Sequence, residues 1–282
     1  MAKKPLQNRY LLAEILESLY KKYNHPKFIP PDPLEFIYRY STPADREIAG
    51  FLSSCFAYGA VEQINKFLTK LLTPMGKSPA DFIKNFTPED NKHLKALKYR
   101  FNTAQDIIDL ISILKNNLNS HGSLEKLFLK GYQPQDENVI PALSNFRRLM
   151  IEKHHGQISK GLSYLICDPE KASSCKRLLL FLRWMVRKDN IDPGLWKKID
   201  PAKLIIPVDV HMARLSRIIG LHNKKTVNLK TSIEITEGFR KICPADPAKY
   251  DFALCRIGIR ENCTGKANPY CQECELTHFC RK

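Results

Sequence analysis

The chain of 282 residues contains no run of about 18 apolar residues, so we expect no transmembrane helix. Its first residues, Met-Ala-Lys-Lys-Pro, lead into an amphipathic stretch and lack the apolar core of a secretory signal. Regular alternation of apolar and polar residues is missing, as are internal repeats and low-complexity tracts. These absences argue against membrane-spanning, repetitive and mainly β proteins, and we expect a cytoplasmic protein.

Acidic residues are scarce beside basic ones. The sequence has 29 aspartates and glutamates against 45 lysines and arginines, a net charge of +16. Most of this excess lies in the second half, where 26 basic and 14 acidic residues fall between Arg147 and Lys282. A basic surface of this size usually binds phosphate, which indicates a nucleic-acid partner. The alternative is that the charge only keeps the protein soluble.

Cysteine is rare until the end of the chain, where four of the nine cysteines fall in the last 20 residues. These four follow the pattern Cys-x7-Cys-x2-Cys-x5-Cys, at Cys263, Cys271, Cys274 and Cys280. Soft thiolate ligands select zinc or an iron–sulfur cluster. Two zinc knuckles need two Cys-x2-Cys pairs, so the single pair favours a [4Fe–4S] cluster, with zinc as the alternative. Two disulfides are a weaker interpretation, because nothing in the sequence indicates secretion. Cys255 and His278 are rival ligands.

Apolar residues recur at helical spacing through most of the chain, which predicts an all-α fold. Thr42 followed by Pro43 has the form of a helix N-cap with proline in the first turn. Thr231 and Glu234 have the spacing of a capping box, which predicts a helix at 227–235 despite its β-branched residues. We expect further helices at 10–23, 61–72, 106–118 and 139–152.

The segment 162–188 has the outline of a helix–hairpin–helix. A short helix at 162–167 and a tight connector at 168–174 precede a long helix from Cys175 to about Lys188. The N-terminus of the long helix presents free backbone N–H groups, which suit a DNA phosphate. We therefore expect DNA contacts from the connector and from one face of the helix, at Ser173, Ser174, Arg177, Arg183 and Arg187.

Two residues near helix starts have side chains suited to covalent catalysis. Lys176 lies in the first turn of the long helix, where the helix dipole and Arg177 favour the neutral amine that nucleophilic attack requires. Asp209 opens another predicted helix, whose N-terminus keeps the carboxylate ionised. Taken alone, Lys176 is more simply explained as a solvated surface lysine and Asp209 as an ordinary N-cap.

Taken together, these features resemble the helix–hairpin–helix DNA glycosylases of the endonuclease III superfamily. The resemblance rests on the order of Lys176, the helix start Val208-Asp209-Val210-His211 and the four cysteines. Those enzymes space their cluster ligands Cys-x6-Cys-x2-Cys-x5-Cys, one residue shorter in the first interval. The segments 56–58 and 244–258 also resemble theirs, so the similarity extends over most of residues 8–282.

The chain departs from that superfamily in two places. The connector 168–174 replaces the usual Gly-rich hairpin, and the interval from Lys176 to Asp209 is longer than in endonuclease III. Both features resemble the archaeal 8-oxoguanine glycosylases. The helix sequence at 175–189 further resembles the bacterial DUF2400 family, whose function is unknown.

The resemblance implies a two-lobed helical fold. Residues 1–45 and 200–282 would form one lobe, with the cysteine cluster at 255–282, and residues 46–199 the other, ending in the helix–hairpin–helix. It also implies a monomeric base-excision repair enzyme that acts on double-stranded DNA with an oxidised base such as 8-oxoguanine.

The resemblance further assigns roles to single residues. Lys176 would attack C1′ of a flipped nucleotide and Asp209 would stabilise the cationic sugar, with β-elimination at the abasic site as a second step. Tyr58 lies near the loop that those enzymes insert into the duplex, and His211 near the DNA. Aromatic residues at helical spacing usually belong to a core, but three are candidates for the base pocket: Phe181, Trp184 and Trp196.

Two other interpretations stay open. A non-catalytic DNA-binding protein with a structural metal-bound tail would bind DNA without forming a covalent intermediate. A zinc protein of unrelated function would be colourless and rich in zinc. The sequence does not name the damaged base.

Overall fold

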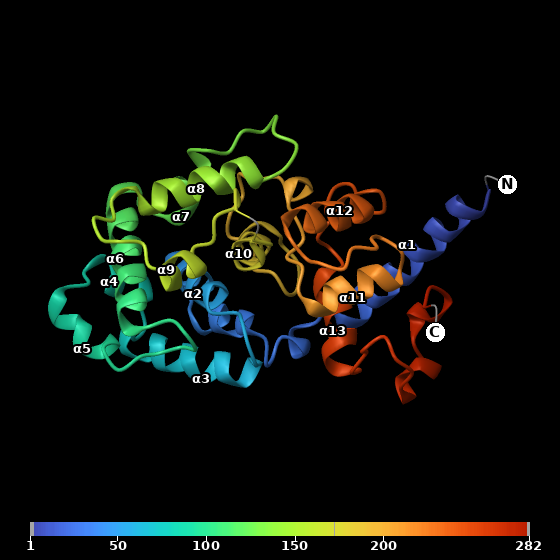
Figure 1. The fold of residues 1–282 in the computed structure, drawn as a ribbon, viewed down its shortest axis with the longest axis horizontal. Coiled ribbons are helices and arrows are strands. Elements are labelled where there is room, and N and C mark those ends of the chain that lie inside the picture. Colours follow the sequence, from blue (N-terminus) through green and yellow to red (C-terminus); the bar gives the residue numbers. More distant parts are fainter. Residues whose placement is uncertain (1–2, 172, 281–282) are drawn as a thin grey trace.

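The computed structural model describes residues 3–171 and 173–280, which form helices joined by loops and short 3-10 helices (Figure 1). The all-α prediction is confirmed, because β pairing within these ranges is limited to isolated bridges at Tyr99–Asn102 and Lys188–Pro193. Among the described helices, none combines the length and apolar character that a membrane span requires. The helices are α1 (Lys3–Tyr23), α2 (Pro43–Cys55), α3 (Val61–Leu72), α4 (Pro79–Lys84), α5 (Asn91–Leu94), α6 (Ala104–His121), α7 (Leu124–Leu129), α8 (Ile140–Glu152), α9 (Lys160–Leu165), α10 (Lys176–Val186), α11 (Val210–Ile218), α12 (Leu229–Arg240) and α13 (Asp251–Arg260).

Local sequence signals set where the helices begin. Thr42 Oγ1 accepts a hydrogen bond from the Asp45 N–H at 3.1 Å, and Pro43 occupies the first turn of α2, as predicted. α12 begins differently, since its N-cap is Asn228, whose Oδ1 accepts a hydrogen bond from the Thr231 N–H at 3.0 Å. The predicted helix is present, but the predicted capping box is wrong. Asn228 lies one turn earlier and already accepts the hydrogen bond from the first-turn N–H of Thr231.

α10 lies in the middle of the molecule, between one end formed by α3 to α8 and another formed by α1, α11, α12 and α13 (Figure 1). Its apolar side chains other than Leu180 are buried, and Phe181 packs edge to face on Phe51 of α2 with ring centroids 5.1 Å apart. Gly50 of α2 permits this close approach, because a Cβ there would stand 2.9 Å from Met185 Cε. The tight contact fixes the middle and the last turn of α10 against α2.

The N- and C-terminal parts of the described chain meet at one end of the molecule, where α1 contacts α13 and the C-terminal segment (Figure 1). Tyr23 Oη donates a hydrogen bond to Glu261 at 3.0 Å, and Lys22 pairs with Glu275 at 2.9 Å. α11 packs against α13 in the same region. Residues from α1 and from beyond residue 200 therefore share one helical cluster.

Two arginines of α10 lie in a buried network of ion pairs. Arg183 is 4% exposed and pairs with Asp251 at 2.6 Å and with Asp192 at 3.1 Å. Arg187 is 3% exposed and pairs with three carboxylates, at Asp189, Asp192 and Asp246. Carboxylates from other segments enclose both guanidinium groups, so neither is available to DNA in this structure, contrary to the prediction from the sequence.

Candidate active site

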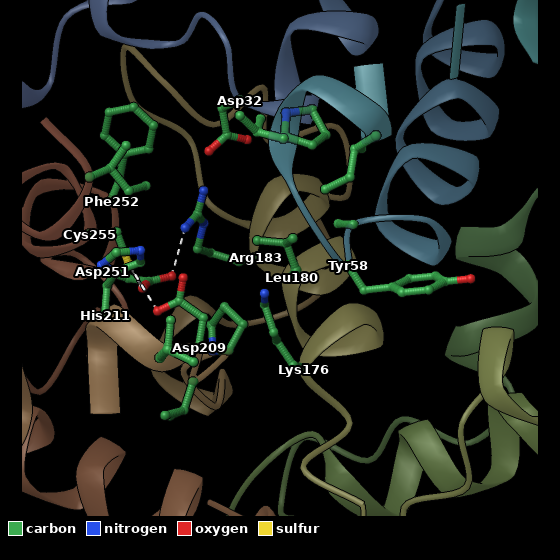
Figure 2. Close-up of a pocket in the computed structure, with 18 of the residues that line it drawn as sticks. Asp32, Tyr58, Lys176, Leu180, Arg183, Asp209, His211, Asp251, Phe252 and Cys255 are labelled. Atoms are coloured by element: carbon green, nitrogen blue, oxygen red, sulfur yellow. Dashed lines mark hydrogen bonds and ion pairs between the residues drawn. The ribbon is translucent and has the colours of Figure 1, made fainter. Parts of the chain in front are cut away.

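A cleft of about 620 Å³ lies between the two ends of the molecule (Figure 2). The start of α10 and the loop between α2 and α3 bound it on one side, and the starts of α11 and α13 bound it on the other. Lys176 and Asp209 both line this cleft, although 33 residues separate them in the sequence. The fold therefore brings together the two residues that were expected to carry the chemistry.

Lys176 is the first residue of α10, and its side chain extends into the cleft (Figure 2). The residue before it, Cys175, adopts the left-handed conformation with φ 49° and ψ 21°, so the chain turns sharply into the helix. Among the described residues, no carboxylate forms an ion pair with the Lys176 amine. A half-buried amine that is not engaged in an ion pair is available to a ligand in the cleft.

Asp209 is the N-cap of α11, as predicted, and its Oδ1 accepts a hydrogen bond from the Met212 N–H at 2.7 Å. The same oxygen lies 3.8 Å from Cys255 Sγ, and this thiol also lies 3.5 Å from Asp251 Oδ1. One thiol proton serves only one carboxylate at a time. The cap thus fixes the orientation of the half-exposed Asp209 carboxylate at the edge of the cleft (Figure 2).

His211, in the first turn of α11, lines the cleft beside Asp209. Its ring lies against Gly258 of α13, where any Cβ would overlap with ring atoms. Desolvation lowers the pKa of His211, and the positive charges of Arg214 and Lys176 add to this effect, while Asp209 opposes it. A neutral imidazole suits hydrogen bonding to a ligand better than neutralisation of a phosphate.

The floor of the cleft contains residues that the sequence reading did not assign to the site. Asp251 is 2% exposed, and burial raises the pKa of its carboxyl, although Arg183 opposes the shift. Burial also raises the pKa of the Cys255 thiol, one turn later in α13. The sequence did contain a signal for these two residues. Asp251 lies in a segment that resembles the glycosylases, and the i,i+4 spacing places the side chains of Asp251 and Cys255 on one helix face. Cys255 therefore belongs to the cleft, which does not favour it as a metal ligand.

One wall of the cleft presents a flat surface with a charged pair. The Arg256 guanidinium lies over the Phe252 ring at 4.3 Å from its centroid and donates to Asp32 Oδ2 at 2.7 Å. Arg256 is 3% exposed, and its Nε has no acceptor within the described residues. Leu180 of α10 faces the same space (Figure 2). The wall combines an aromatic ring with hydrogen-bonding groups, as sites for planar ligands do.

The remaining predicted DNA contacts divide between two surfaces. Tyr58 extends away from Lys176 (Figure 2), and its ring centroid lies 5.0 Å from that of Tyr164. Arg177 is 7% exposed and lies over the Tyr164 ring at 3.7 Å. The cleft is lined by Tyr58 and Ser174, whereas a neighbouring groove is lined by Ser173 and Arg177.

The aromatic residues expected to form a base pocket lie in the core. Phe181, Trp184 and Trp196 are each at most 2% exposed, and none of them lines the cleft. The rings of Phe181 and Trp196 meet edge to face at 5.2 Å, and Trp196 Nε1 donates to the buried Glu47 at 2.7 Å. The base-pocket prediction does not agree with this structure, because all three rings are enclosed in the core, with Phe181 packed on Phe51 of α2 and on Trp196.

The four C-terminal cysteines line one small apolar cavity of about 20 Å³, together with Leu215 and Ile218 of α11. Arg214 donates to the Cys263 carbonyl and ties this loop to α11. Within the described ranges, no three His, Cys, Asp or Glu side chains gather closely enough for a single metal ion. Four cysteine thiols are soft donors of the kind that zinc and iron–sulfur clusters take. His278 is exposed and lies outside the cavity.

Comparison with protein families matches residues 32–260 to the DUF2400 family, which is described as a protein of unknown function. The matched range includes Lys176, Asp209 and Asp251, and it ends before Cys263. Comparisons with curated proteins and with solved structures give no match.

Proposed function

The chain belongs to the DUF2400 family, and we propose that it is a DNA glycosylase with lyase activity, acting through Lys176 and Asp209. The observation that carries this proposal is the meeting of the two side chains in one cleft, each from the start of a different helix. Net charge supports a DNA substrate, because a protein of +16 attracts phosphate. The likeness to helix–hairpin–helix glycosylases supplies the reaction type.

The proposed reaction begins at the amine of Lys176. Its neutral form attacks C1′ of an extruded nucleotide, the C1′–N bond to the base breaks, and the base leaves with the bonding electron pair. The proton that the amine loses ends on the departing base. Ring opening then breaks the C1′–O4′ bond, the second amine proton passes to O4′, and a Schiff base between Lys176 and C1′ remains. In the β-elimination, C2′ loses a proton to water, the C3′–O bond breaks, and the phosphate leaves with the bonding electron pair.

Asp209 stabilises the positive charge that develops on the sugar as the base departs. The carboxylate is held by its cap hydrogen bond and requires little reorganisation when that charge appears. Burial keeps Asp251 less acidic than usual beside it, and Arg183 occupies the second oxygen of Asp251. The two carboxylates of the cleft therefore have different environments, and Asp209 is the one at its edge.

In this proposal, the extruded base binds against the wall formed by Phe252, Leu180 and the Asp32–Arg256 pair. A cleft of about 620 Å³ lies in the range of small-ligand sites. Stacking on an aromatic ring and hydrogen bonds to the base edge are how enzymes hold a flipped base. An oxidised base such as 8-oxoguanine offers added carbonyl and N–H groups to this wall, which replaces the aromatic pocket expected from the sequence.

The C-terminal cysteines are proposed to bind a [4Fe–4S] cluster, with zinc as the alternative. Four thiols in one apolar enclosure support this assignment, and Cys263, Cys271, Cys274 and Cys280 would hold the group. When bound, the cluster supplies structural support at the end of the molecule that carries α11 and α13. No step of the proposed reaction passes through it.

Borohydride trapping on a panel of damaged duplexes tests the proposal. Reduction of the Schiff base should link the wild-type protein covalently to one damaged substrate, and Lys176→Gln should abolish this product while retaining the fold. Lys188→Gln is the matched control, because Lys188 is exposed just beyond the other end of α10 and does not line the cleft. It should trap at the wild-type rate.

Asp209→Asn separates catalysis from helix capping. Asparagine caps almost as well as aspartate, so the stability loss should be about 1 kcal/mol or less. Base release should fall by roughly a hundredfold or more, because the variant lacks the charge that stabilises the cationic sugar. If both variants excise and trap like the wild type, the assignment is wrong. DNA binding without trapping on any substrate would instead identify a non-catalytic DNA-binding protein.

A further inference from the structure

A second groove, of about 520 Å³, adjoins the hairpin between α9 and α10 and shares no lining residue with the cleft. Neighbouring residues of the hairpin divide between the two spaces, since Ser174 and Lys176 line the cleft while Ser173 and Arg177 line the groove. We call it the basic groove, because it is lined by four basic side chains, Arg147, Lys160, Lys171 and Arg177, and by one carboxylate, Asp168.

Arg177 gives the main evidence that this groove suits an anion. The side chain is 7% exposed, and no carboxylate within the described ranges forms an ion pair with it. Its guanidinium lies over the Tyr164 ring at 3.7 Å and donates to the Tyr164 carbonyl, while its Nε has no acceptor there. A buried cation without a counter-ion is unfavourable, so an anion in the groove would balance the charge of Arg177.

Arg147 of α8 presents a second guanidinium to the same space. It pairs with Asp168 at 3.3 Å, and both side chains are 16% exposed. Its Nε also has no acceptor among the described residues. Planar guanidinium groups match the oxygens of a phosphate better than lysine amines do.

Two backbone amides of the connector before α10 form hydrogen bonds within the hairpin. The Ser173 N–H donates to the Lys171 carbonyl at 2.7 Å, and the Cys175 N–H donates to Ser173 Oγ at 3.2 Å. These two amides are therefore already used within the hairpin, so an anion in the basic groove would bind to side chains.

We propose that the basic groove binds a phosphodiester group of the DNA strand that runs from the cleft past the hairpin, with Arg147 and Arg177 as its ligands. The inference rests on the proposed function for the identity of the polymer, but it needs no reaction at Lys176. The groove and the cleft flank one hairpin, so one strand can contact both. The sites would then fix the register of the DNA relative to Lys176.

Fluorescence anisotropy with a labelled, undamaged duplex over a range of salt concentrations tests this site. Arg147→Gln should lower the slope of log affinity against log salt by about one and weaken binding roughly tenfold near 0.1 M salt. Arg148→Gln is the matched control, since Arg148 is the next residue of α8, is exposed, pairs with Glu152 at 3.7 Å and lies outside the groove. It should bind like the wild type.

Asp168→Asn provides a second variant that does not depend on removal of an arginine. Asparagine retains the acceptor for the Glu170 N–H, which Asp168 Oδ1 binds at 3.1 Å, and removes the one negative charge of the groove. This variant should bind the duplex several-fold more tightly. Identical salt slopes for the wild type and Arg147→Gln would overturn the proposal.

The experiments also distinguish a site for a small anion from a site for the DNA strand, and failure of the glycosylase proposal from failure of the groove proposal. If inorganic phosphate raises the melting temperature of the wild type but not of Arg147→Gln, while both bind the duplex equally, the groove takes a small anion and the strand assignment is wrong. Because the duplex is undamaged, a wild-type protein that never traps a substrate would still show the predicted slopes. The glycosylase proposal and the groove proposal therefore fail independently.

Discussion

At the scale of single residues, the cleft depends on a close approach between α11 and α13 at Gly258. Alanine in a helix is normally about 0.5–1 kcal/mol more stable than glycine. At Gly258, however, a Cβ would overlap with the His211 ring, whose atoms must then move. We expect Gly258→Ala to destabilise the protein by about 1–3 kcal/mol, as overpacking does, in thermal or urea unfolding.

Gly238→Ala in α12 is the matched control for this prediction. Its Cβ would meet the flexible end of Leu221 at 2.9 Å, which can move aside. We expect a much smaller change in the free energy of unfolding. If Gly258→Ala instead raises the melting temperature, His211 does not rest on α13 as the structure has it.

At the scale of elements, buried ion pairs join α10 to α13 and to the turn that follows α10. Arg183 pairs with Asp192 and Asp251, which are 0% and 2% exposed. Removal of one partner from a buried network leaves uncompensated charge. We expect Arg183→Leu to lower the free energy of unfolding by about 3–5 kcal/mol, measured by urea denaturation.

The exposed pair Glu62–Lys66 of α3 provides the contrast. Its side chains are 72% and 62% exposed, so solvent screens their attraction. Lys66→Ala should leave the urea midpoint almost unchanged. Equal effects of the two substitutions would show that the Arg183 network does not join the elements energetically.

At the scale of the whole molecule, the proposed metal site of the C-terminal cysteines would stabilise the end that carries α1, α11 and α13. We expect protein purified without oxygen to contain about four iron and four sulfide per chain. Cys274→Ser should lose this metal and melt at a lower temperature, because metal binding contributes directly to folding. Metal analysis and visible absorption measure the first effect, and calorimetry measures the second.

Cys243→Ser is the control, since Cys243 is half-buried and does not line the four-cysteine cavity. It should retain the metal content of the wild type. A colourless wild-type protein that carries zinc would contradict the cluster assignment and favour the alternative ligand. It would leave the proposals for the cleft and the basic groove untouched.

The sequence by itself determined several helices and some of the residues at their starts. Capping and helical periodicity depend on neighbours within about four positions, so α3 at Val61–Leu72, the Thr42 cap of α2 and the Asp209 cap of α11 could all be predicted. The position of Lys176 in the first turn of α10 followed in the same way.

Only the tertiary structure decided which side chains face the cleft. Helical spacing placed Arg183 and Arg187 on the face of Lys176, but Asp251 and Asp246, 68 and 59 residues later, pair with them inside the molecule. Whether a charge is buried or free depends on partners that folding brings from distant segments, and no local pattern encodes them. The same reason explains why Trp196 lies in the core and why Asp251 and Cys255 meet Asp209.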